Sequence, residues 1–152
     1  MPKNPIVLTG AALVLILSPL TIQHAQSDSS SCSCHPPKDG ETTHWGGNEK
    51  VSFIEKHSYR TLQGTVLAFA DGTPLADALV EVFTDPKKSE GQRVAACRTG
   101  PDGKFCFSGL ASGKYELRCS VNTGWNVTHV YLSVNHIIGK NKELQVRMSV
   151  GT

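Results

Sequence analysis

From Tyr59 onward, short runs of alternating apolar and polar residues are separated by turn residues. This period of two is typical of half-buried strands, because successive side chains of a strand point to opposite faces of a sheet. Seven short strands joined by Gly, Pro and Asp turns indicate an all-β fold, a Greek-key β-sandwich of two sheets. The predicted strands are Leu62–Ala68, Ala78–Phe83, Arg93–Thr99, Lys104–Ser108, Lys114–Val121, Thr128–Val134 and Leu144–Val150.

The alternation also predicts which side chains face the core. Phe105 and Phe107 share one side of their strand, and Tyr115, Leu117 and Cys119 share one side of the next. Each large apolar side chain that is buried contributes roughly 1.5–3 kcal/mol to stability. In a domain this small such a core only just offsets the cost of ordering the chain, so a disulfide would help.

The N-terminal segment differs from the rest of the chain. One Lys, an apolar run of about fifteen residues and a polar stretch predict a signal peptide over residues 1–27. Cleavage would fall before Asp28 or after Ala25. The alternative is an uncleaved membrane anchor, and only in that case do we expect contact with a membrane. We therefore expect a secreted or periplasmic protein. Residues 28–58 have the composition of a flexible leader, in which Val51–His57 could add a short strand or helical turn.

Three cysteines surround the Pro101-Asp102-Gly103 turn, and export would allow them to form disulfides. If Pro101-Asp102 is a two-residue hairpin loop, Cys97 faces Cys106 directly, and this is the pair we predict. If Gly103 instead forms a left-handed bulge, the register shifts and Cys119 becomes the competing partner of Cys97. No His or Lys motif accompanies these cysteines, so we expect no catalytic thiol.

Cys32-Ser33-Cys34-His35 combines two thiols and an imidazole, which are ligands that zinc and copper prefer. A structural zinc site needs four ligands, and no second pair of Cys or His follows at the usual spacing. We therefore predict no metal site and no cofactor, and we interpret this cluster as part of a solvated leader.

The strand residues carry a resemblance to a known family. The stretch Gly64–Phe83, followed by Thr99–Leu117 and the Gly124-Trp125 pair, resembles the carboxypeptidase regulatory-like domain. The resemblance covers roughly residues 59–150 and implies a prealbumin-like, or transthyretin-like, β-sandwich domain over residues 59–152. It implies no activity, because the matching residues occupy turns and core positions. Related hydrolases of transthyretin-like type are expected to end in Tyr-Arg-Gly-Ser, whereas this chain ends in Met-Ser-Val-Gly-Thr.

The function that the sequence indicates is that of an exported, non-enzymatic module with a structural or binding role. Its formal charge of +2, without a basic stripe, argues against nucleic acid as the partner, which leaves an unidentified protein or glycan. One alternative is a carbohydrate-binding module, with Trp125 as a possible ligand-stacking platform; core packing is the other role for this ring. A small transthyretin-like hydrolase is the disfavoured alternative.

Overall fold

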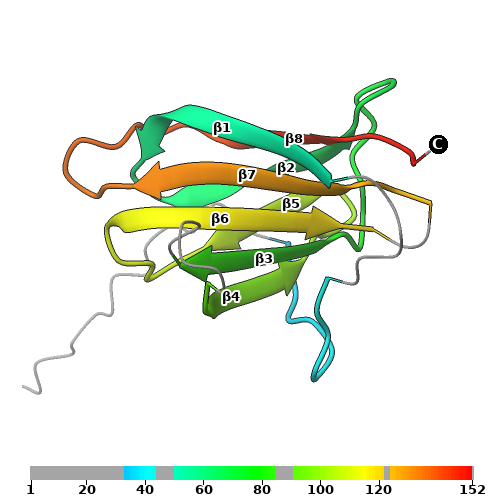
Figure 1. The fold of residues 1–152 in the computed structure, drawn as a ribbon, viewed down its shortest axis with the longest axis horizontal. Helices are drawn as coiled ribbons and strands as arrows, with labels where there is room; N and C mark the ends of the chain where they lie inside the picture. Colours follow the sequence, from blue (N-terminus) through cyan, green and yellow to red (C-terminus); the bar gives the residue numbers. More distant parts are fainter. Residues whose placement is uncertain (1–32, 44–49, 85–90, 122–123, 152) are drawn as a thin grey trace, which may run out of the picture.

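The computed structural model describes residues 33–43, 50–84, 91–121 and 124–151, and these form two packed β-sheets (Figure 1). One sheet has five strands in the order β1-β7-β6-β3-β4, and the other has three in the order β5-β2-β8. The strands are β1 (Lys50–Tyr59), β2 (Leu62–Ala68), β3 (Leu79–Thr84), β4 (Arg93–Arg98), β5 (Lys104–Phe107), β6 (Gly113–Ser120), β7 (Val127–Val134) and β8 (Leu144–Met148). The predicted all-β sandwich is confirmed.

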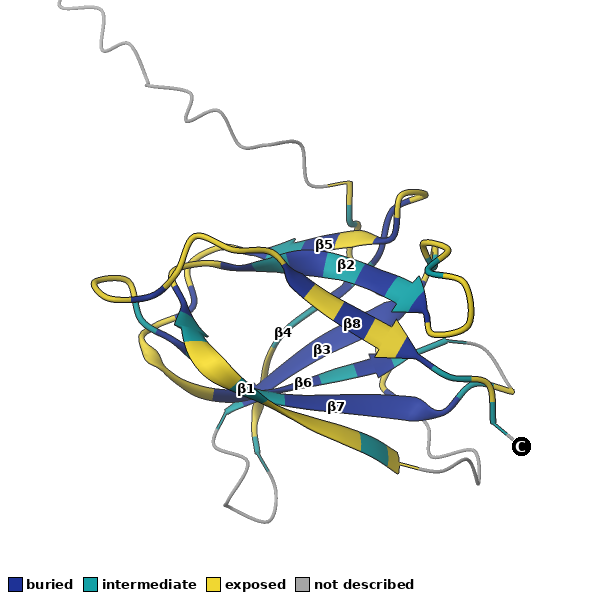
Figure 2. Ribbon diagram, turned by 90° about the horizontal axis from the view of Figure 1, so that it is seen from above, coloured by how far each residue is buried: buried dark blue, intermediate teal, exposed yellow. Residues whose placement is uncertain are grey.

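The core lies between the two sheets, and Figure 2 shows buried residues in the strands of both layers. Phe105 from the three-stranded sheet and Leu117 from the five-stranded sheet are 1% and 0% exposed. The predicted inward positions, Phe105, Phe107, Tyr115, Leu117 and Cys119, are all buried in one cluster. The period of two therefore identified the core face correctly, although β3 is buried on both of its faces.

The leader prediction was wrong for the segment next to the domain. Residues 50–58, assigned to a flexible leader, form most of β1, which pairs in parallel with β7 at the edge of the five-stranded sheet. Most β1 side chains are exposed, so its sequence lacks the apolar alternation that identified the other seven strands. The fold therefore has eight described strands where seven were predicted.

Part of the remaining leader is also ordered against the sandwich. The backbone N–H and the hydroxyl of Thr43 both donate hydrogen bonds to the fully buried carboxylate of Glu81, which also accepts one from Arg93 over 2.9 Å. Glu41 pairs with Arg98, and this hydrogen bond from the guanidinium holds the pKa of Glu41 below its usual value. Residues 33–43 are thus fastened to β3 and β4 through buried or half-buried carboxylates.

No helix within the described ranges has the length and apolar character needed to cross a membrane. The predicted signal peptide, residues 1–27, lies outside those ranges.

Gly103 occupies a position where a side chain would be strained. Its φ is +71°, and a Cβ there would lie 2.7 Å from the backbone oxygen of Val66. Gly72 has a similar φ of +75° but open space around it, so it is a matched control. We expect Gly72→Ala to lower the free energy of unfolding by about 1–2 kcal/mol from backbone strain alone. Gly103→Ala should cost at least about 1 kcal/mol more, because the Cβ also clashes. Urea denaturation measures both, and equal losses would show that the clash is absent.

Candidate functional site

The most pronounced irregularity of the five-stranded sheet lies between β1 and β7. Ile54 pairs with Tyr131 and Ser58 pairs with Ser133, so four residue steps on β1 span two on β7. Extra residues of this kind bend a strand locally and are frequent next to binding sites. Pairing resumes at Ser58, whose hydroxyl lies 2.7 Å from that of Ser133.

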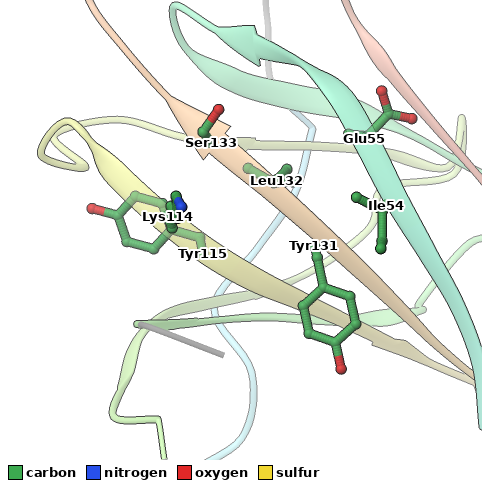
Figure 3. A pocket seen from close by; sticks show the side chains of 7 residues that line it. All are labelled: Ile54, Glu55, Lys114, Tyr115, Tyr131, Leu132 and Ser133. Carbon is green, nitrogen blue, oxygen red and sulfur yellow. The ribbon is translucent and has the colours of Figure 1, made fainter. Parts of the chain in front are cut away.

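A pocket of about 360 Å³ opens at this irregularity (Figure 3). The volume lies in the range of sites that hold small ligands. Its lining combines apolar groups with two opposite charges and hydroxyl groups. The lining residues are Ile54, Glu55, Lys114, Tyr115, Tyr131, Leu132 and Ser133.

Hydrogen bonds position the polar groups of this pocket. The hydroxyl of Tyr59 donates to the Glu55 carboxylate over 2.9 Å, and burial together with this carboxylate raises the pKa of Tyr59. The Lys50 ammonium donates to the hydroxyl of Tyr131 over 3.3 Å and lies 5.9 Å from the centre of its ring. Glu55 and Tyr131 are therefore held by residues of β1, although Tyr131 itself belongs to β7.

A buried polar cluster adjoins the pocket, consisting of Glu116, Arg118 and His129. Glu116 lies opposite Tyr131 in the pairing of β6 with β7. Its carboxylate is hydrogen-bonded to Nδ1 of His129 and accepts a 3.0 Å bond from Arg118, whose guanidinium carbon lies 3.8 Å from the centre of the Phe83 ring.

Burial governs the ionisation of this cluster. It opposes ionisation of Glu116, but the bonds and charges of Arg118 and His129 outweigh it and lower the pKa of that carboxyl. Burial also lowers the pKa of His129, which has no exposed surface. A pair of a histidine and a carboxylate is common in catalysis, but this histidine is closed to any substrate, so the cluster is suited to stabilising the sheet.

The structure does not confirm the predicted Cys97–Cys106 disulfide, because Cys97 is a free thiol. The prediction assumed that the Pro101-Asp102-Gly103 turn joins two paired strands. In the structure β4 pairs with β3 and β5 pairs with β2, so the turn carries the chain from one sheet to the other.

The alternative pair of Cys97 with Cys119 does not form either. Val80 pairs with Cys97 on one side and with Cys119 on the other, so β3 lies between the two cysteines. Two strand spacings amount to roughly 9–10 Å, beyond the reach of a disulfide. Cys119 is fully buried, and burial raises the pKa of its thiol, which makes the thiol unreactive.

The described part of the Cys32-Ser33-Cys34-His35 cluster separates its ligand atoms. Cys34 packs against the core, whereas Nε2 of His35 lies 3.6 Å from the carboxylate of Asp77, on the opposite face of this extended segment. The described residues contain no group of three or more His, Cys, Asp or Glu side chains that could hold a metal ion. Cys32 lies outside these residues.

Trp125 lies at one end of the sandwich, where it is paired with Val150 and packs against the core. Its ring is half-buried and lines a second depression of about 210 Å³ together with Phe69 and Val150. The surface that the described residues give this depression is apolar, although Ser149 belongs to its lining. The Trp125 ring therefore has the core-packing role. Stacking of a ligand on this ring stays a prediction.

The sequence analysis missed the pocket between β1 and β7. Its residue Tyr115 was identified as core, but Ile54 and Glu55 were assigned to the leader. The available signal was Val51–His57, noted only as a possible strand. A register shift between this segment and β7, more than seventy residues away, has no local signature in the sequence.

Comparisons with known proteins agree with the fold. The family model of the carboxypeptidase regulatory-like domain matches residues 61–149. Among solved structures, the crystal structure of (S)-allantoin synthase is similar at 14% identity with a TM-score of 0.39. This match covers 62% of the present chain and 42% of that one, so the chain spans less than half of that protein. No curated protein matches the chain. Because the family model spans more than half of the sequence and the strands it covers form the sandwich, the chain belongs to the carboxypeptidase regulatory-like domain family.

Proposed function

We propose that this protein is an exported, non-enzymatic binding module, secreted or periplasmic, and that its ligand occupies the pocket between β1 and β7. The observation that carries the proposal is the composition of that pocket. Exposed apolar surface from Ile54 lies next to Tyr131, its partner in the pairing of β1 with β7, and the Glu55 carboxylate and the Lys114 ammonium belong to the same lining. An apolar surface with a few placed polar groups is the usual design of a small-ligand site.

The ligand class that fits this lining best is a saccharide. A sugar ring has an apolar face that packs on aromatic and aliphatic side chains, and hydroxyl groups that need donors and acceptors. Tyr131 supplies the ring, Ser133 a hydroxyl, and Glu55 a charged acceptor within one lining. The Trp125 depression offers apolar surface alone, so the proposed carbohydrate site moves from Trp125 to Tyr131.

A non-enzymatic role is supported by the location of the reactive groups. Cys97, Cys119 and His129 are buried, and none of them lines the pocket. The described lining contains no Cys or His, and the partner of the Ser133 hydroxyl is the Ser58 hydroxyl at 2.7 Å rather than an imidazole, which favours binding contacts over covalent chemistry. The hydrolase alternative would need turnover of a ureide substrate, and an assay without turnover would agree with a binding role.

A glycan array tests the proposal with three proteins: wild type, Tyr131→Ala and Trp125→Ala. We expect wild type to bind a subset of oligosaccharides, and Tyr131→Ala to weaken that binding at least about tenfold, because stacking on an aromatic ring and its hydroxyl together contribute about 1.4 kcal/mol or more. Trp125→Ala should bind nearly as wild type does. Thermal melts of all three confirm that the variants are folded.

Two outcomes would contradict the proposal. If wild type binds no glycan on the array, the saccharide class is wrong. If Trp125→Ala loses binding while Tyr131→Ala keeps it, the ligand site lies at the end of the sandwich and the pocket between β1 and β7 has another role.

A further inference from the structure

The segment that carries Cys34 runs beside β4. The N–H of His35 donates to the carbonyl of Arg98 over 3.0 Å, and the N–H of Arg98 donates back to His35 over 2.8 Å. This two-way bonding is that of an antiparallel pair. Because side chains alternate along extended chains, the residue before His35 and the residue before Arg98 lie on the same face. Cys34 and Cys97 are these residues, and that face is the core side.

The contacts of the two sulfur atoms agree with this placement. Cys34 packs against the core cluster to which Cys97 belongs. The Cys34 thiol donates to the carbonyl of Cys106 over 3.7 Å, and the proximity of Cys34 adds to burial in raising the pKa of the Cys97 thiol. To form a disulfide the two sulfur atoms must come within about 2.05 Å of each other. Residues 33–35 meet β4 through a single bridge, outside any strand.

We propose that Cys34 and Cys97 form a disulfide that fastens residues 33–43 to the edge of the five-stranded sheet in an oxidising environment. The two thiols lose two protons and two electrons, and a sulfur–sulfur bond forms between them. A small-molecule disulfide such as oxidised glutathione accepts the two protons and the two electrons and is released as two thiol molecules. The reaction passes through a mixed disulfide that the second cysteine resolves.

The environments of the two cysteines set the order of these steps. Cys97 is buried, and this burial raises the pKa of its thiol, whereas Cys34 is partly exposed. Cys34 therefore attacks the small-molecule disulfide first, and Cys97 then displaces the glutathione. The proposal is independent of the saccharide site, because it involves the opposite edge of the sheet from β1.

Peptide mapping tests the proposal on the full chain. The protein is incubated with oxidised glutathione, denatured, alkylated and digested with trypsin without reductant. Cleavage after Arg93 and Arg98 releases Cys97 in the peptide of residues 94–98. We expect most of this peptide to be linked to the leader peptide that contains Cys34, and we expect reductant to release it.

Two variants identify the sulfur atoms involved, because trypsin leaves Cys32 and Cys34 in one peptide. The link should persist in Cys32→Ser and disappear in Cys34→Ser. The proposal is overturned if the peptide of residues 94–98 is recovered alkylated from the oxidised wild type. It is equally overturned if the link persists in Cys34→Ser and is lost in Cys32→Ser. Circular dichroism of each variant confirms the β-sheet fold before digestion.

Discussion

Replacing Phe105 with alanine is expected to lower the free energy of unfolding by about 3–5 kcal/mol, a large share of what a domain of this size has. Phe105 is 1% exposed and lies between the sheets, with its ring centre 6.1 Å from that of Phe107. Its ring also lies against Gly64 of β2, where a Cβ would come within 2.9 Å of the ring. Truncation would leave a cavity that the two rigid sheets cannot close.

Phe69→Ala is the matched control for this prediction. Phe69 has the same side chain but is 64% exposed, so its truncation should change the free energy of unfolding by no more than about 0.5 kcal/mol. Urea denaturation at neutral pH measures both variants. A loss below about 1.5 kcal/mol for Phe105→Ala would mean that the core relaxes around the missing ring, contrary to the packing described above.

The second large effect is expected at the buried polar cluster. Glu116→Ala should lower the free energy of unfolding by about 3–5 kcal/mol, because it removes the only carboxylate that bonds both His129 and Arg118 in the described contacts. The Arg118 guanidinium would be left half-buried over the Phe83 ring, and its Nε has no hydrogen-bond partner among the residues that the structure describes. Glu143→Ala, at an exposed position, should stay within about 0.5 kcal/mol of wild type.

The Glu116 contribution depends on pH in a defined direction. The pKa of Glu116 is lower in the folded protein than in the unfolded chain, where it is about 4.3. The charged carboxylate therefore stabilises the fold above about pH 4.3, and this stabilisation is lost as pH falls through the pKa of the folded protein. The difference in free energy of unfolding between wild type and Glu116→Ala should therefore be largest at pH 7 and decrease on acidification below about pH 4. A difference that does not change with pH would show that the cluster acts through packing alone.

Local patterns predicted much of this fold. Seven of the eight described strands were found within two residues of their bounds, because their apolar side chains recur at the spacing of a strand between turn residues, although β3 is buried on both faces. β1 was missed because a strand at the edge of a sheet with little burial shows no such alternation. The cysteine pairing failed for a different reason: Pro101-Asp102-Gly103 has the sequence of a hairpin turn, but the same turn can also carry the chain between sheets.

The pocket was not predictable from local patterns because it depends on a long-range register. Ile54 and Tyr131 are neighbours only through the parallel pairing of β1 with β7. β1 also precedes residues 61–149, which match the family model. Family membership therefore accounts for the sandwich, whereas the proposed site depends on a strand that the match does not include.

The location of the ligand is tested most directly by amide chemical shifts. Uniformly ¹⁵N-labelled protein is titrated with the oligosaccharide that binds most tightly on the array. The pocket between β1 and β7 predicts the largest shifts at Ile54, Lys114 and Ser133, which contribute to its lining from three strands. Shifts centred on Phe69 and Trp125 would contradict the account, as would a spectrum that stays unchanged at a saturating concentration of the oligosaccharide.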